Sequence, residues 1–346
     1  MYVVMFHVTA IAEENGLIIA DWIRPILKNG GTGVTLFFVI SAFTLCFTLN
    51  FQQKENQYLK NFYTRRIFRI APLYYLWLFI YLAINHFHAH PYKFIAFSTF
   101  TFNAFPSTQA GYVSGSWTIG VEMAFYSFFP FLFKVINTLN KALVFFAVTC
   151  CVAIIHYNVM DYIAANNLAD LKNYRIIFSL LNNLPIFALG IVTYFLYEKL
   201  KAAGNNVHAY MLIAGIMIFT ILPYLAFNNA YRRIAVVIFG VAYLLIFLGL
   251  SKIDLRIIVN KVSVFFGKIS YSVYLNHMFI AFRMGKIFKW IFAYQLPSLI
   301  SLLLCICVTL IIVVPISYLT YRFIELPFIN WGKKIIKNRK EAVAVA

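Results

Sequence analysis

Two histidines lie in stretches of this chain that are otherwise apolar. His7 follows Met1-Tyr-Val-Val-Met-Phe, and His277 follows Ser270-Tyr-Ser-Val-Tyr-Leu-Asn. An ionisable side chain inside a bilayer is costly to maintain, so it is a functional hypothesis by default. Imidazole has a pKa of about 6.5 and suits a general base that takes a proton from a weak nucleophile such as a hydroxyl. For Ser270 and His277, two turns apart on one helix face, packing and chemistry are both open interpretations.

Glu122 is a carboxylate about two turns into another apolar stretch, which begins at Ser116-Trp117. Facing lipid would cost such a group roughly 3 kcal/mol, so we expect it to face a bundle interior, paired with an arginine or lining a wet cavity. A structural ion pair is one interpretation, and support or orientation of a catalytic histidine is the other. Trp117 and Ser41, in apolar surroundings of their own, are candidates for substrate contact or for polar structural contacts.

Arg65, Arg66 and Arg69 cluster at the entrance of a further apolar run, with Arg65 and Arg69 four residues apart on one helix face. Planar guanidinium groups arranged in this way suit phosphate. An ordinary cationic anchor with snorkelling side chains is the competing interpretation, and the arginines alone favour it. Pro72 is expected in the first turn of the helix that follows, where its missing N–H costs little.

The composition requires a membrane to position these residues. Hydrophobic residues make up 62% of the chain and charged residues 12%, with 37 phenylalanines, far from the roughly 25% charged content of soluble domains. We therefore predict an all-α, polytopic transmembrane bundle of about ten helices. Residues 1–330 would form one integral domain, and residues 331–346 a basic cytoplasmic tail.

Apolar runs long enough to cross about 30 Å of hydrocarbon define nine spans. We place them at Val34–Phe51, Phe68–Asn85, Ser116–Phe133, Ala142–Tyr157, Ile177–Tyr197, Ala209–Phe227, Ile234–Leu250, Ile269–Ile287 and Leu296–Ile324. Met1–Ile11 is a tenth apolar segment but rises only about 16 Å as a helix, so we expect a truncated first helix. Phe94–Phe105, flanked by His86, His88 and His90, suits a re-entrant or interfacial element.

Most of the 29 lysines and arginines fall on one side of this arrangement. The positive-inside rule then places both termini and the Lys54–Arg69 loop in the cytoplasm. The net charge of +18 is thereby explained by topology. Nucleic-acid binding would need a basic face on a soluble module, and the sequence offers none.

The five cysteines all lie within apolar spans, where they behave as small hydrophobic residues. They predict no disulfide framework. Cys305 and Cys307 lack a nearby second pair, and Cys150 and Cys151 lie inside one span, so no metal site is expected.

Six blocks, in order along nearly the whole chain, resemble the membrane acyltransferases of the acyltransferase 3 family, which includes bacterial O-antigen and exopolysaccharide O-acetyltransferases. The blocks are Val3-Val-Met-Phe-His7, Gly33-Val-Thr-Leu-Phe-Phe-Val-Ile-Ser41-Ala-Phe, Phe62-Tyr-Thr-Arg65-Arg66-Ile-Phe-Arg69-Ile-Ala-Pro72-Leu-Tyr-Tyr, Ser116-Trp117-Thr-Ile-Gly-Val-Glu122, Gly267-Lys-Ile-Ser270-Tyr271-Ser272-Val-Tyr-Leu-Asn-His277 and Arg322-Phe-Ile-Glu325-Leu-Pro327-Phe.

The resemblance implies a ten-helix bundle that moves an acyl group, usually acetyl, from cytoplasmic acyl-CoA to a carbohydrate hydroxyl across the membrane. It identifies His7 with the family's catalytic base, the arginine cluster with its donor-phosphate site and Glu122 with its fourth-helix acid. Acyl-CoA would be a co-substrate, with no permanently bound cofactor. The acceptor would be a cell-envelope glycan or glycolipid, lipopolysaccharide O-antigen among them, and the membrane the bacterial inner membrane. The oligomeric state stays open.

Some positions depart from the family's pattern. Thr35 stands where an acid is usual, Ala42 where glycine is usual, and Met123 where a second acid often follows. The family's arginine three turns before the histidine would lie upstream of Met1. The rival function is a transporter or flippase that uses His7, Glu122 and His277 to bind substrate or relay protons. No internal repeat is apparent in the sequence, which argues mildly against a transporter of inverted halves.

Overall fold

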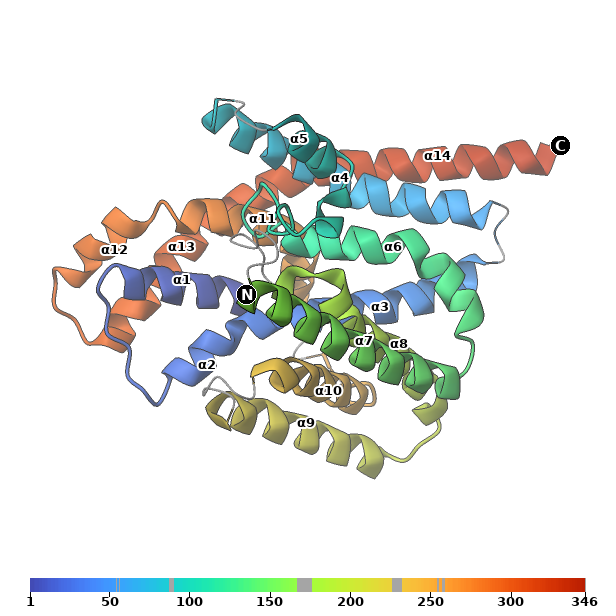
Figure 1. Cartoon of the computed structure of the whole chain (residues 1–346), viewed down its shortest axis with the longest axis horizontal. Helices are drawn as coiled ribbons and strands as arrows, with labels where there is room; N and C mark the ends of the chain where they lie inside the picture. Colours follow the sequence, from blue (N-terminus) through green and yellow to red (C-terminus); the bar gives the residue numbers. More distant parts are fainter. Residues whose placement is uncertain are drawn as a thin grey trace. The chain divides into compact units, whose positions relative to one another are not determined.

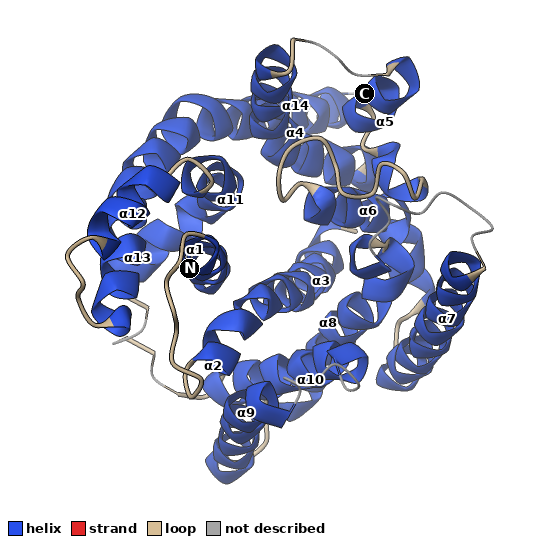
Figure 2. Ribbon diagram, turned by 60° about the vertical axis from the view of Figure 1, so that its left-hand side comes forward, coloured by secondary structure: helices blue, strands red, loops and turns tan. Residues whose placement is uncertain are grey.

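The computed structural model describes residues 1–53, 55, 57–86, 90–166, 176–225, 232–253, 255–256 and 259–345, and it is helical with no strand in that part (Figures 1 and 2). The predicted all-α bundle is therefore confirmed. Seven helical stretches there are long and apolar enough to cross a bilayer, as expected of a multi-pass membrane protein. They are Arg24–Gln52, Tyr58–Ile84, Trp117–Val135, Leu139–Ala165, Leu180–Leu200, Asn205–Leu225 and Ser298–Ala342.

Figure 1 follows the helices along the chain. The α-helices are α1 (Tyr2–Glu14), α2 (Arg24–Lys28), α3 (Gly33–Gln52), α4 (Tyr58–Ile84), α5 (Pro91–Ser98), α6 (Trp117–Val135), α7 (Leu139–Ala165), α8 (Leu180–Leu200), α9 (Asn205–Leu225), α10 (Arg232–Leu250), α11 (Lys261–Ala281), α12 (Gly285–Phe292), α13 (Ser298–Thr320) and α14 (Leu326–Val345). Short 3₁₀ turns lie at η1 (Asn29–Thr32), η2 (Thr101–Ala104) and η3 (Ile176–Phe178), and a π-helical turn, η5, at Tyr321–Glu325.

Two predicted helix boundaries are wrong for physical reasons. The span placed at Phe68–Asn85 begins ten residues earlier, so Pro72 lies in the interior of α4 rather than in its first turn. The span placed at Ile269–Ile287 is two helices, α11 and α12. Asn260 sets the start of α11 with a capping box, in which its side chain accepts from two backbone amides and Ser263 returns a bond to its N–H.

The ends of the chain also differ from the predicted spans. α1 runs three residues beyond Ile11, and its 13 residues still rise only about 20 Å. After α13, the π-helical turn η5 leads into α14, so the predicted tail is helical through Val345. The stretch predicted to be re-entrant holds only α5 and η2, which are too short to span, and His88 beside it lies outside the described residues.

Backbone contacts divide the chain into two compact units, and each is described by itself. Unit 1 comprises Met1–Ile40 and Leu196–Tyr318. In this unit α1 packs beside α11 and η1, and α9 packs along α10 (Figure 2). Gly30 permits the approach of η1, because a Cβ there would lie 2.6 Å from the Cβ of Phe6 in α1. Small residues at such contacts allow helix backbones to meet closely in apolar surroundings.

Unit 2 comprises Ser41–Phe195 and Leu319–Ala346. Its core is aromatic: the rings of Phe125 and Phe187 stack with centroids 4.0 Å apart, and both side chains are fully buried. α14 lies along α4 (Figure 1), where the Trp331 ring meets the Phe68 ring edge to face at 5.2 Å. This packing holds α4 between the aromatic core and the C-terminal helix.

Gly249→Ala is expected to destabilise the protein by about 1–3 kcal/mol because α9 and α10 would be overpacked. The added methyl group would lie 2.6 Å from the Cβ and 2.7 Å from the backbone nitrogen of Leu212. Thermal unfolding of the purified protein in detergent measures the loss. Gly267→Ala in α11 is the control, because nothing lies within 4 Å of its Cβ position. A Gly249→Ala protein that unfolds at the wild-type temperature would contradict the close helix contact.

Candidate active site

In unit 1, the structure brings His7 of α1 and His277 of α11 together. Their ring centroids are 5.4 Å apart and the ring planes are tilted by 43°. The Phe6 ring lies 4.8 Å from His7, and the Tyr274 ring lies 5.7 Å from His277. The two histidines, 270 positions apart in sequence, thus lie in one cluster of aromatic rings.

His277 is held by its own helix. Its side chain is fully buried, and Nδ1 lies 3.1 Å from the carbonyl oxygen of Val273, one turn earlier. A carbonyl only accepts, so Nδ1 carries the proton of this hydrogen bond and the neutral ring keeps a lone pair on Nε2. Nε2 is buried and has no hydrogen-bond partner among the described residues. The next residue back, Asn276, donates to Ser317 Oγ of α13 at 3.1 Å and fixes this part of α11.

Two other polar residues, Thr9 and Ser270, lie on the helices that carry the histidines. Thr9 is buried two residues after His7, and its hydroxyl finds no partner in the described part of the chain. Ser270, by contrast, is exposed and donates to the carbonyl of Gly267, one turn earlier. The structure therefore does not bring Ser270 to His277, although the two are two turns apart on one helix. Thr9 escaped sequence analysis because a threonine in an apolar helix is common.

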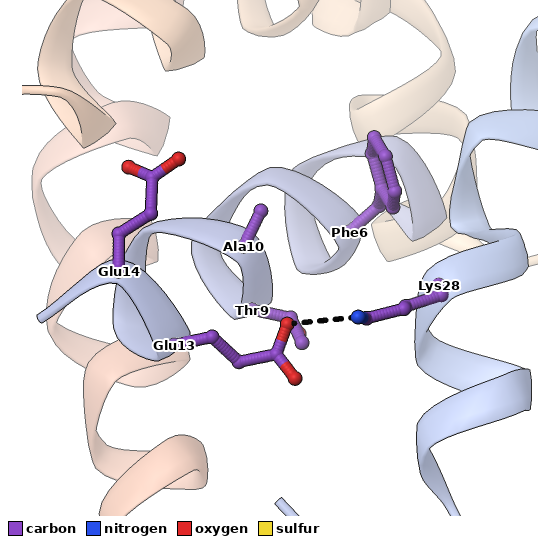
Figure 3. Close-up of a pocket in the computed structure, with 6 residues that line it drawn as sticks. All are labelled: Phe6, Thr9, Ala10, Glu13, Glu14 and Lys28. Carbon is purple, nitrogen blue, oxygen red and sulfur yellow. Dashed lines mark ion pairs between the residues drawn. The ribbon is translucent and has the colours of Figure 1, made fainter. Parts of the chain in front are cut away.

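Beside α1, a recess of about 220 Å³ is lined by α1 and α2 (Figure 3). Its lining residues are Phe6, Thr9, Ala10, Glu13, Glu14 and Lys28. Glu13 forms ion pairs with Lys28 at 3.4 Å and with Arg24 at 3.3 Å. These pairs tie α1 to α2 one turn beyond Thr9, and they help to fix the helix that carries His7.

In unit 2, Glu122 is buried and bound by two hydroxyl groups. Ser41 Oγ donates to its Oε1 at 2.9 Å, and the Tyr126 hydroxyl donates to the same oxygen. The two hydroxyl oxygens are 3.0 Å apart. Buried carboxylates require such donors, because an unsatisfied one would be costly. Tyr126 lies four residues after Glu122 on the same helix, a spacing that could have identified it from the sequence.

Arg66 lies next to this carboxylate without bonding to it directly. Its guanidinium stands over the Tyr126 ring at 5.3 Å and the Phe62 ring at 5.7 Å. Both Arg66 and Arg69 interact electrostatically with Glu122. Arg66 Nε is buried and has no hydrogen-bond partner within the part of the chain that is described. The expected arginine near Glu122 is present, and it acts through space and through an aromatic ring.

Arg65 turns the other way and meets an acid from the loop between α3 and α4. Its Nη2 donates to both carboxylate oxygens of Glu55, at 2.8 and 3.0 Å. Lys340 of α14 lies 3.2 Å from the same carboxylate, and Arg339 donates to Thr64 at 2.9 Å. The cationic cluster therefore includes two residues of α14 that sequence analysis missed. Nothing in the sequence spacing relates them to Arg65.

The predicted site residues thus form two groups. His7 and His277 meet in unit 1, whereas Glu122, Ser41 and the three arginines lie in unit 2. Arg69 is exposed on α4. Trp117 also lies in unit 2, where its ring stacks on the Phe178 ring with centroids 4.6 Å apart. No cluster of three metal-ligating side chains occurs among the described residues.

Glu55 should contribute stability that depends on pH. Burial raises the pKa of its carboxyl, but hydrogen bonds from Arg65, Lys340 and Asn61 and the Arg65 charge outweigh burial and lower the pKa. A lowered folded-state pKa means that the contribution is complete above the unfolded value of about 4.3 and is lost as the pH falls through the folded value.

We therefore expect Glu55→Gln to lower the unfolding temperature at pH 7 and to lower it less at pH 3, measured by thermal unfolding in detergent. Glu198→Gln is the matched control, because its ion pair with Lys201 is exposed and contributes little. An equal effect of Glu55→Gln at both pH values would contradict this account.

The chain is similar to known proteins over most of its length. A family model described as an acyltransferase domain matches residues 1–321. "Putative O-acetyltransferase SAR0937" of Staphylococcus aureus (strain MRSA252) is 26% identical over an alignment of 363 positions, gaps included. The alignment covers 95% of this chain and 57% of that protein. "Putative acetyltransferase ORF330" of Acidianus two-tailed virus is 27% identical over 274 residues, 76% of each chain. The chain thus spans just over half the length of the staphylococcal relative. No solved structure matches it significantly.

Proposed function

Because the chain belongs to the acyltransferase 3 family, we propose that it is a membrane-embedded O-acyltransferase that moves an acyl group, acetyl in the first instance, from acyl-CoA to a carbohydrate hydroxyl. The observation that carries this proposal is His7 beside a second, fully buried imidazole in an apolar helix bundle. A neutral imidazole can act as a base where no water competes for the proton. The names of the relatives, an O-acetyltransferase and an acetyltransferase, agree with this chemistry.

A sugar hydroxyl is a poor nucleophile until a base takes its proton. His7 would take that proton as the oxygen attacks the thioester carbonyl, and would return it to the departing CoA thiolate. An acyl-histidine intermediate is the alternative route, in which His7 itself attacks first. Both routes need one histidine nitrogen with a free lone pair.

The arginines of α4 are the proposed donor site. Guanidinium groups bind phosphate through paired N–H donors, and CoA carries several phosphate groups. Arg66 suits this role best because its Nε has no partner in the described part and, unlike Arg65, it forms no ion pair there. Arg339 and Lys340 add positive charge beside α4. A donor held by its phosphates at the cytoplasmic face would not itself have to cross the bilayer.

The positive-inside bias supports an orientation with both termini and the Glu55 loop in the cytoplasm, where acyl-CoA is available. We assign the protein to the bacterial cytoplasmic membrane on that basis. The proposed acceptor is a glycan or glycolipid of the cell envelope, with O-antigen as one candidate. Glu122, bound by Ser41 of α3 and Tyr126 of α6, would hold these two helices together next to Arg66.

His7→Ala should reduce acyl transfer by about 10²- to 10⁴-fold while leaving the amount of folded protein unchanged, because general base catalysis contributes about that much. The assay incubates purified protein with acetyl-CoA and a panel of methyl glycosides, and measures released CoA and acetylated glycoside by chromatography. His208→Ala is the control, because His208 is buried elsewhere in unit 1 and bonds to the carbonyl of Leu248. Wild-type turnover in His7→Ala would refute the role of His7. Glycoside transport without CoA release would favour a transporter.

Arg66→Gln should raise the KM for acetyl-CoA about tenfold or more, since a hydrogen bond to a charged group contributes about 1.5–3 kcal/mol. Arg65→Gln should raise it less, because Glu55 already neutralises Arg65. The KM for the glycoside should stay unchanged in both variants. Lys289→Gln in α12 serves as a control for general loss of positive charge. An unchanged donor KM in Arg66→Gln would count against phosphate binding by this residue.

A further inference from the structure

We propose that His277 is a positioning residue for His7, whose ring N–H it binds through Nε2. This hydrogen bond would turn the other His7 nitrogen, with its lone pair, toward the acceptor hydroxyl. The inference rests on the proposed function, in which His7 is the base. It gives a role to a buried histidine that the transfer reaction does not otherwise use.

The first support is the state of the His277 ring. Its Nδ1 donates to the Val273 carbonyl at 3.1 Å, which leaves the lone pair on Nε2. Nε2 is fully buried, yet no described residue donates to it. A buried acceptor without a donor is costly, and a catalytic role is one of the reasons for which such a group is retained.

The second support is the distance to His7. With centroids 5.4 Å apart, facing ring nitrogens come within hydrogen-bond range of about 3 Å after a modest rotation of one ring. His277 itself is fixed on α11 by Val273, and its neighbour Asn276 is bonded to Ser317. His7 is only partly buried and is bordered by the Phe6 ring. The ring that turns is therefore His7, and the ring that directs it is His277.

His277 neither gains nor loses a proton over the whole reaction. The acceptor O–H bond breaks, and its proton passes to the free nitrogen of His7 as the oxygen forms a bond to the thioester carbon. The C–S bond then breaks, and the leaving thiolate takes the proton from His7 to give free CoA. While His7 carries both protons, the Nε2 lone pair of His277 stabilises its N–H, as an orienting partner does for a histidine base.

Enzyme kinetics provide the first test. His277→Leu should lower kcat on the order of 100-fold, with the KM for acetyl-CoA and for the methyl glycoside unchanged. For comparison, a serine protease whose histidine base is held in the wrong tautomer loses about 10⁴-fold in kcat. His277→Gln should recover part of this loss, since its amide oxygen can accept the same bond. His208→Gln is the matched control, a buried histidine of the same unit whose nitrogens face the carbonyls of Leu248 and Leu200. Wild-type kcat in folded His277→Leu would overturn the proposal.

The second test does not depend on turnover. In protein labelled with ¹⁵N-histidine in bilayers, His7 is assigned by the loss of its signals in His7→Gln. Wild-type protein should show His7 as a single tautomer with a hydrogen-bonded N–H, and His277→Leu should show a mixture of both tautomers. An unchanged His7 spectrum in His277→Leu would overturn the positioning role. If acetyl-CoA is not consumed by wild-type protein, the proposed function fails while this spectrum still decides the inference.

Discussion

The buried carboxylate of Glu122 is the constraint on which unit 2 depends. One of its oxygens receives hydrogen bonds from Ser41 of α3 and Tyr126 of α6. Leaving that oxygen without donors in apolar surroundings would cost free energy comparable to a large share of the stability of a domain. Helices α3 and α6 must therefore keep their register. Arg66 then stands over the Tyr126 ring because α4 packs on the same aromatic core.

In unit 1, the buried imidazole of His277 is only partly satisfied by hydrogen bonds. His277 satisfies one ring nitrogen through its own helix and leaves the other without a partner in the described residues. The contrast with Glu122 is informative: one oxygen of the acid receives two hydrogen bonds, whereas Nε2 of the imidazole receives none from the described residues. Structural polar groups in an apolar bundle are expected to have all their hydrogen bonds made, whereas reactive groups are expected to keep a donor or acceptor free.

The sequence predicted the helical membrane class because hydropathy is a sum over about 20 residues and tolerates local error. It also singled out His7, His277, Glu122 and the arginines as candidates, since ionisable groups stand out in apolar runs. The start of α4 at Tyr58 was missed because Lys60, Asn61 and Thr64 are polar, and packing against α14 rather than hydropathy makes that stretch helical. Pairings such as Glu55 with Lys340 join residues far apart in the chain, and local spacing contains no information about them.

Arg65 and Arg66 are identical neighbours in the sequence, but their side chains lie in different environments. Successive side chains on a helix point about 100° apart, so one guanidinium faces Glu55 and the other faces the Tyr126 ring. The first is paired with Glu55, which also binds Lys340 of the C-terminal helix, and the second forms no direct ion pair with a described residue and interacts with Glu122 through space. Since both residues are arginine, natural variation could move the proposed phosphate-binding position along α4 only by changing the side chains around them.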